Sequence, residues 1–312
     1  MGMIGGHSIT AWALFHLIVI VCLALDLGVI KRKARLMEVR ETVFWNVIWT
    51  ALGLGFGAAV AYAYGRQSGF EYVTGYVVER ALSVDNIFVF VIIFRYFSVP
   101  ARHQYRALLW GILLALVMRA AFIVAGVAIV SLFHWMLYIF GAFLVYTGAH
   151  LLFQKEEPPH PERNPLVRLA KRFFPIETQP QGERLFVRRS GRLHATPLLL
   201  VLIVLATTDF VFALDSLPAI FGVTLDPFII YSSNVFAILG MRVLYFLLAA
   251  MLPHFRFLKH GLSAVLSFIG TRMLLDHYVK IPTSGALLVV CAILGIAVAA
   301  SLLPPGRKKG SV

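Results

Sequence analysis

The chain has 312 residues, of which 60% are hydrophobic and only 14% are charged, against roughly 25% charged in soluble domains. A mean hydropathy of +0.83 and apolar runs of about 20 residues exclude an ordinary soluble domain and predict an integral membrane protein. The net charge of +13 would suit nucleic acid. The basic residues, however, cluster between apolar runs, as membrane topology requires, so we expect lipid and no nucleic acid as partner.

Nine apolar ranges are predicted to cross the bilayer as helices, which makes the fold class an all-α polytopic membrane protein. No basic segment precedes the first range and no clear cleavage site follows it, so we expect a retained helix and not a signal peptide. The predicted spans are 9–29, 43–64, 70–94, 107–130, 134–154, 197–221, 226–250, 259–279 and 284–303.

The basic residues lie mostly on one side of these spans. Of 28 Lys and Arg residues, 22 follow odd-numbered spans, and only Arg66 and Lys280 fall on the other side. The positive-inside rule therefore predicts an outside N-terminus and a cytoplasmic C-terminal tail at 304–312. We expect one transmembrane domain over 1–312 in the inner (plasma) membrane, with spans one to five in 9–154 and spans six to nine in 197–303.

The only long polar stretch, 155–196, is rich in Pro and Arg and is expected to be a cytoplasmic linker. Within it, residues 166–174 alternate apolar and basic side chains, a pattern compatible with a short helix lying on anionic lipid. The shortness of the pattern favours a solvated linker instead.

Two motifs inside apolar spans share one acidic pattern. In each, a carboxylate is followed six residues later by an aspartate and then by a small polar residue. Insertion of four carboxylates costs on the order of 10 kcal/mol, so their repetition points to a cation site inside the bilayer. The candidate metal ligands are Glu79, Asp85, Asn86, Asp209, Asp215 and Ser216.

Helical geometry places these candidate ligands on two adjacent faces of each helix. Positions seven apart share a helix face, so the first acid and the small polar residue of each motif align, while Asp85 and Asp215 lie on an adjacent face. Pro218 cannot donate to the carbonyl of Leu214 and leaves that oxygen available beside Asp215. Such all-oxygen sets suit Mg²⁺, Ca²⁺ or Mn²⁺ more than Zn²⁺ or Cu⁺.

An alternative role for the acids is to neutralise arginines inside the spans. With Asp26 included, five acids outnumber the four arginines, so we favour metal binding for Asp85 and Asp215, and leave both roles open for Glu79 and Asp209. Asp26, at the end of the first span, is a possible additional ligand or an interfacial residue. The arginines concerned are Arg80, Arg119, Arg242 and Arg272.

Other conspicuous residues are expected to have structural roles. His16 and His150 are isolated, so we expect each to be packed or hydrogen-bonded. Gly53, Gly55 and Gly57 are expected to allow close helix packing.

Further markers repeat in the same order as the acidic motifs. Met118-Arg119 in span four resembles Met241-Arg242 in span seven, and the segment 146–152 in span five resembles 268–274 in span eight. A three-helix unit that starts once at an odd span and once at an even span is inverted in the membrane. We therefore predict an inverted repeat of spans 3–5 and 6–8, with the substrate site at its interface.

The motifs resemble those of the TerC/Alx family of integral membrane proteins, usually grouped with LysE-type exporters. The resemblance covers nearly the whole chain, in the segments Glu79–Asn86, Tyr138–Leu144, Leu185–Pro197, Phe212–Phe221 and Asn234–Arg242. It implies manganese export or metal supply to exported proteins, with a link to tellurite resistance, and it places the acidic positions at the candidate ligands named above. One departure is Ala206, where family members commonly have a glutamate.

The resulting hypothesis is a carrier that exports Mn²⁺ or a similar hard divalent cation, driven most simply by proton exchange. The alternatives are a non-transporting membrane scaffold in metal or tellurite stress or in protein insertion, and a LysE-type exporter of an organic cation. No Walker motif and no covalent catalytic constellation is present, so we expect neither an enzyme nor a permanently bound cofactor.

Overall fold

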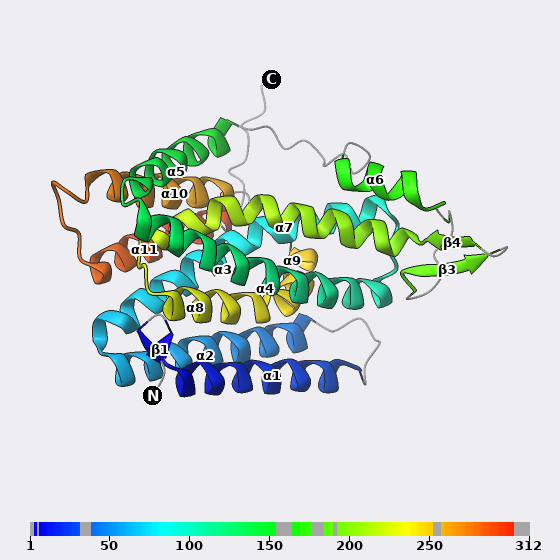
Figure 1. The fold of residues 1–312 in the computed structure, drawn as a ribbon, viewed down its shortest axis with the longest axis horizontal. Helices are drawn as coiled ribbons and strands as arrows, with labels where there is room; N and C mark the ends of the chain where they lie inside the picture. The colour runs from blue at the N-terminus through cyan, green and yellow to red at the C-terminus, as the bar shows by residue number, and fades with distance from the viewer. Residues whose placement is uncertain are drawn as a thin grey trace, which may run out of the picture.

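The computed structural model describes residues 3–4, 6–31, 39–153, 164–175, 177, 184–189, 192–251 and 257–302. Within these ranges the chain forms eleven α-helices and two small antiparallel hairpins (Figure 1). The helices are α1 Ile9–Lys31, α2 Val39–Tyr64, α3 Arg66–Tyr96, α4 Ala101–Leu132, α5 Met136–Phe153, α6 Pro165–Phe173, α7 Pro197–Phe221, α8 Pro227–Leu239, α9 Met241–Met251, α10 Leu258–Leu275 and α11 Thr283–Leu302. The strands are β1 Met3–Ile4, β2 His7–Ser8, β3 Phe186–Arg189 and β4 Arg192–Ala195.

Each of the nine predicted ranges coincides with a helix or a helix pair, but the count of nine spans is not confirmed. Among the described residues, five helices (α2, α4, α5, α7 and α11) are long and apolar enough to cross a membrane. A sixth span is obtained if α8 and α9, which bend by 42° at Gly240, are counted together. The sequence predicted one unbroken helix there, and the break is a correction.

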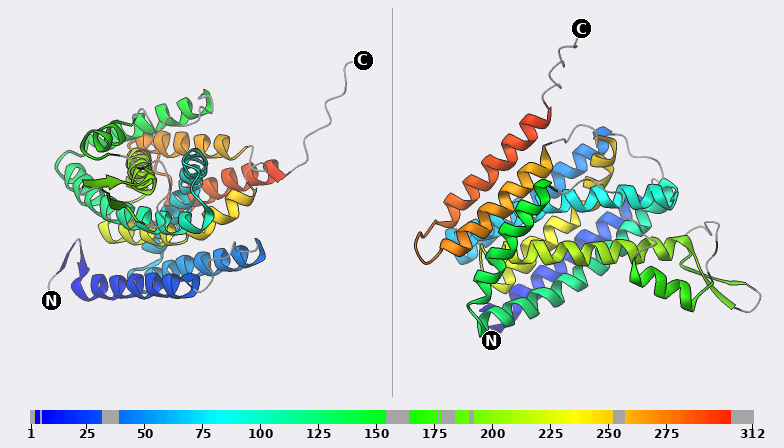
Figure 2. Two further views of the ribbon diagram at one scale, coloured as in Figure 1. Left: turned by 90° about the vertical axis from the view of Figure 1, so that its right-hand side faces the viewer. Right: turned by 90° about the horizontal axis from the view of Figure 1, so that it is seen from above.

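Other helices surround α3, which contacts α2, α7, α8, α9 and α11. In Figures 1 and 2, α1 and α2 form an outer layer on one side, α5 and α10 lie on the opposite side, and α3, α4, α7 and α8 fill the middle. A chain that buries α3 on several sides allows polar residues in it to avoid lipid, which is the condition for placing charge at membrane depth.

The buried faces of α3 and α7 follow the helical repeat of three and four residues. In α3, one stripe runs through Tyr72, Tyr76, Glu79, Ser83, Asn86 and Phe90. In α7, the corresponding stripe runs through Leu198, Val201, Leu205, Asp209, Ala213, Ser216 and Ile220. Both stripes are apolar at their ends and polar in the middle, so the fold brings the two polar segments into the protein interior.

Glycines set the closest helix contacts. A Cβ at Gly148 would lie 2.4 Å from Ser267 Oγ and 2.9 Å from the Ser263 carbonyl, and one at Gly270 would lie 2.6 Å from the Gly141 carbonyl. These contacts join α5 to α10. Close packing is likewise confirmed for two of the three glycines singled out in α2, since Gly53 and Gly57 face tyrosine rings of α3; the prediction is wrong for Gly55, whose Cβ would meet nothing within 4 Å.

Within the described part of the linker, residues 165–173 form the short helix α6, which contacts α7 while most of its side chains are exposed, so the solvated linker stays a prediction. Asn164 caps α6 by accepting hydrogen bonds from Leu166 N (2.9 Å) and Val167 N (3.3 Å), and it donates to Thr207 Oγ1 of α7 at 2.6 Å. Val167 is buried between α6 and α7. The β3–β4 hairpin pairs Phe186 with Ala195 and extends beyond the start of α7 (Figure 1).

Candidate functional site

The polar middles of α3 and α7 meet in the protein interior. Glu79, Asn86, Asp209 and Ser216 are each no more than 4% exposed. Asn86 Nδ2 donates to Asp209 Oδ1 at 3.5 Å, a long hydrogen bond that links the two helices. The first acid and the small polar residue of each motif therefore share a buried face, as their spacing of seven predicts.

Arg119 of α4 supplies the positive charge of this network. Its guanidinium forms an ion pair with Glu79, lies 3.7 Å from Asp209 Oδ1, and donates to Ser216 Oγ at 3.2 Å and to Asn234 Oδ1 at 2.6 Å. Burying a charge is expensive unless it is paired and hydrogen-bonded. Glu79 and Asp209 therefore neutralise a buried arginine in this structure, which is one of the two roles that the sequence left open for them.

Asp85 and Asp215 lie beside this network and are half-buried. Both line a pocket of about 240 Å³ whose wall also includes Glu79 and Arg119. The polar side chains around it come from α3, α4, α5 and α7, and the remaining wall is apolar. The polar lining is Glu79, Asp85, Asn86, Arg119, Thr147, His150, Asp215 and Ser216.

The six candidate ligands do not form a single coordination shell. In the described ranges, no three His, Cys, Asp or Glu side chains are grouped closely enough to hold a metal ion. The acids instead form two sets that share Glu79: Glu79 and Asp209 face Arg119, whereas Glu79, Asp85 and Asp215 line the pocket. α7 also continues as a helix through Pro218, so the motif is not opened there.

Three polar residues of the site were not assigned to it from sequence. Asn234 of α8 accepts from Arg119, and Thr147 and His150 of α5 contribute to the pocket wall. His150 is exposed and stacks on Tyr146, with ring centroids 5.8 Å apart. The run Ser232-Ser233-Asn234 in an apolar helix was the available signal for Asn234.

The other arginines have different surroundings. Arg80 donates to the Ala237 carbonyl at 3.0 Å, and Arg272 donates to the Gly222 carbonyl at 3.0 Å. Both carbonyls lie at helix C-termini, whose oxygens lack intrahelical donors. Arg242 stacks over the Tyr105 ring, with Cζ 4.4 Å from its centroid.

The remaining candidates lie away from the pocket. Asp26 belongs to α1, and its side chain is outside the described residues. His16 is hydrogen-bonded as expected, with Nδ1 2.8 Å from the Trp12 carbonyl. Cys22 and Cys291 are both free thiols on different helices.

Comparisons with known proteins identify relatives that are named as membrane proteins. The chain is 48% identical to the uncharacterized membrane protein STKORF319 of Myxococcus xanthus over 292 residues, covering 94% of this chain and 92% of the relative. It is 43% identical to a Photorhabdus laumondii protein named "Putative membrane-bound redox modulator Alx" (91% and 92% covered) and 42% identical to a protein of the same name in Escherichia coli K12 (91% of each). No solved structure matches the chain. Residues 64–309 match the family described as "Integral membrane protein TerC family", and the chain belongs to that family.

Proposed function

We propose that this TerC family protein carries a hard divalent cation, most simply Mn²⁺, out of the cytoplasm. The observation that carries the proposal is the pocket in which Asp85 and Asp215, from two different helices, line one cavity among apolar helices. Ionisable residues at membrane depth are costly and typically mark ion pathways. A cation would compensate the negative charges of these two carboxylates, while Arg119 forms ion pairs with Glu79 and Asp209.

The donors in the pocket favour a hard ion. Asp85, Asp215, Asn86 and Ser216 offer carboxylate, amide and hydroxyl oxygens, the ligand types preferred by Mg²⁺, Ca²⁺ and Mn²⁺. His150 adds an imidazole at the same wall, a ligand that Mn²⁺ and softer ions accept more readily than Ca²⁺ does. The volume of about 240 Å³ leaves room for a cation that keeps several of its waters.

The packing of α5 against α10 supports the inverted repeat. Gly148 approaches Ser263 and the backbone nitrogen of Ser267, and Gly270 approaches Gly141 and the backbone nitrogen of Val145. Adding 122 to the α5 position and subtracting 122 from the α10 positions converts the first set of contacts into the second. A two-fold axis between two antiparallel helices relates contacts in this way. We propose on this basis that spans 3–5 and 6–8 are inverted repeats, as in carriers that expose a midplane site alternately to each side.

Proton exchange is the proposed driving force. Asp85 and Asp215 carry like charges at one pocket, so a proton on either relieves their repulsion when no metal is bound. Metal binding would release that proton, and a higher cytoplasmic pH should then favour loading and increase export. The proposal places the N-terminus outside and the 155–196 linker in the cytoplasm of the inner membrane, and it assigns no enzymatic reaction. The relationship to LysE-type exporters belongs to the same proposal.

Reconstitution tests the proposal directly. Purified protein in liposomes should move ⁵⁴Mn²⁺, and Asp85→Asn and Asp215→Asn should each lower the rate at least about tenfold with near-normal membrane abundance, because the amide keeps the size and loses the charge. Asp226→Asn is the control, since Asp226 lies outside the pocket lining.

The same assay separates the alternatives. Absence of Mn²⁺ flux through the wild-type protein would favour the non-transporting scaffold, and flux of lysine without Mn²⁺ would favour the organic-cation exporter. Normal Mn²⁺ export by one Asn variant would remove that aspartate from the site.

A further inference from the structure

Arg119 occupies the centre of the buried polar network. Its guanidinium is 2% exposed and contacts α3 through Glu79, α7 through Asp209 and Ser216, and α8 through Asn234. It also borders the pocket that contains Asp85 and Asp215. One side chain therefore connects four helices at the place where the proposed cation would bind.

The guanidinium is held unevenly. Nη1 contacts Glu79, Ser216 and Asn234, while Nη2 reaches Asp209 only at 3.7 Å. Arg119 Nε, Asp209 Oδ2 and Asn234 Nδ2 are buried without a hydrogen-bond partner among the described residues. Because unpaired buried polar atoms are costly, this network has unused bonding capacity beside the pocket: a shift of Arg119 would use its Nε donor, and a second cation would use the acceptor Asp209 Oδ2.

We infer that Arg119 is a tethered cation that competes with the transported cation for the carboxylates of Glu79 and Asp209. This inference rests on the proposed function. A metal ion in the pocket repels the guanidinium and offers the carboxylate of Glu79, which lines the pocket, a second positive partner. Asn234 and Ser216 are neutral acceptors that keep the displaced guanidinium hydrogen-bonded, so it remains buried at lower cost.

The balance of charges at the pocket gives Arg119 a role in the release of the transported cation. Glu79, Asp209, Asp85 and Asp215 sum to four formal negative charges, which Arg119 reduces to three. Without that reduction, the carboxylates would hold a divalent cation more tightly. The return of Arg119 to Glu79 and Asp209 restores the ion pairs and weakens the hold on the metal, which favours its release.

Arg242 provides a matched control. It is 1% exposed, it follows a methionine as Arg119 does, and it lies over the Tyr105 ring outside the pocket lining. Arg242→Gln removes a buried guanidinium of the same kind without changing the charge at the pocket.

The test uses the purified full-length protein, with Mn²⁺ binding measured by calorimetry and ⁵⁴Mn²⁺ flux measured in liposomes. Arg119→Gln should lower the Mn²⁺ Kd at least about tenfold, because it removes a positive charge beside the site, and should lower the flux by about as much. Arg119→Lys keeps the charge and should stay within about threefold of wild type in both measurements, whereas a purely structural need for the guanidinium makes Lys as defective as Gln. Arg242→Gln should leave the Kd within about twofold.

A second pair of variants covers the case in which Arg119→Gln does not fold. Glu79→Gln should weaken Mn²⁺ binding, and Glu79→Gln with Arg119→Gln should restore the Kd to within about threefold of wild type, since replacing both members of a buried pair leaves no unpaired charge. A double variant that binds as weakly as Glu79→Gln overturns the inference. So does a folded Arg119→Gln protein with an unchanged Kd, or one that binds more tightly and transports at the wild-type rate. A wild-type protein that binds no Mn²⁺ overturns the proposed function as well.

Discussion

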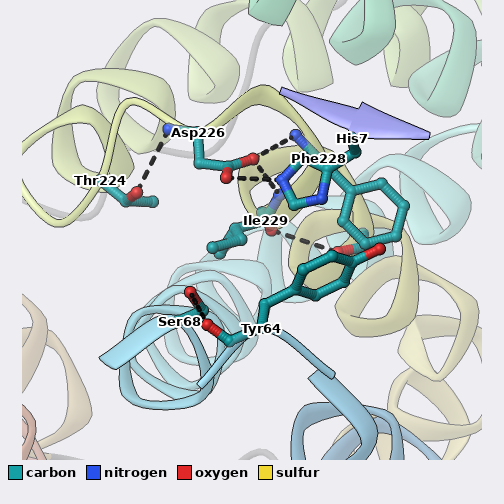
Figure 3. A network of polar contacts seen from close by, with 8 residues as sticks. His7, Tyr64, Ser68, Thr224, Asp226, Phe228 and Ile229 are labelled. Carbon is teal, nitrogen blue, oxygen red and sulfur yellow. Dashed lines mark hydrogen bonds and ion pairs between the residues drawn. The ribbon is translucent and has the colours of Figure 1, made fainter. Parts of the chain in front are cut away.

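His7 Nε2 lies 2.7 Å from Asp226 Oδ2, which ties the N-terminal β1–β2 hairpin to the start of α8 across 219 positions of sequence (Figure 3). His7 is buried, and its ring packs against Tyr64 and Phe228 with centroid distances of 4.5 Å and 4.8 Å. Asp226 Oδ1 also accepts from Phe228 N and Ile229 N as the N-cap of α8. One carboxylate thus caps α8 and anchors the chain that precedes α1.

The two roles of Asp226 can be separated by substitution. Asp226→Asn keeps a capping oxygen and loses the charge, whereas Asp226→Ala loses both, so Ala should be less stable than Asn by about 1 kcal/mol. Thermal unfolding of the detergent-solubilised protein measures the difference. Equal stability of the two variants would show that the cap contributes nothing. His7→Ala, which removes the ring packing as well, should be destabilised without any change in the cap.

The close approach of α5 and α10 makes a second prediction. Gly148→Ala should destabilise the protein by about 1–3 kcal/mol, because its Cβ would meet backbone atoms of α10 that cannot move independently. Gly55→Ala is the control, since its Cβ would meet nothing within 4 Å and alanine favours a helix by up to about 1 kcal/mol. Thermal unfolding checks both variants. A Gly148→Ala protein as stable as Gly55→Ala would contradict the packing described for this helix pair.

Ala206 tests the departure from the family pattern. It lies in α7, three residues before Asp209, and is half-buried. Ala206→Glu adds a carboxylate near the network and should lower the Mn²⁺ Kd by about threefold or more, with a smaller effect on folding. Ala206→Gln adds nearly the same volume without charge and serves as control. Equal Kd values for the Glu and Gln variants would exclude a charge effect at this position.

Topology gives a prediction that is independent of the metal. A reporter fused within residues 155–196 or after Arg95 should be cytoplasmic, and one fused near Asp226 should be outside, because 22 of the 28 Lys and Arg residues follow odd-numbered predicted spans. Reporter activity and cysteine labelling from each side measure this. A linker exposed on the outer side would contradict both the proposed orientation and the inverted repeat.

The sequence by itself determined the features that depend on local order along the chain. Hydropathy located the helical segments, and a spacing of seven placed Glu79 with Asn86 and Asp209 with Ser216, because helix periodicity is a property of neighbouring residues. The acidic pattern also indicated the correct family. The sequence did not determine how many helices cross the bilayer, because α3 combines spanning length with polar residues that hydropathy counts against it.

Only the tertiary structure decided which charges meet. Arg119, Arg242, Arg80 and Arg272 all stand in apolar sequence, yet Arg119 contacts Glu79 and Asp209 while Arg80 and Arg272 donate to carbonyls at helix ends. The choice depends on helices brought together from distant parts of the chain, and so does the division of the acids between ion pairs with Arg119 and the pocket wall, with Glu79 in both. The bend at Gly240 and the docking of α6 on α7 are of the same kind, because contacts between elements fix them and no local pattern encodes those contacts.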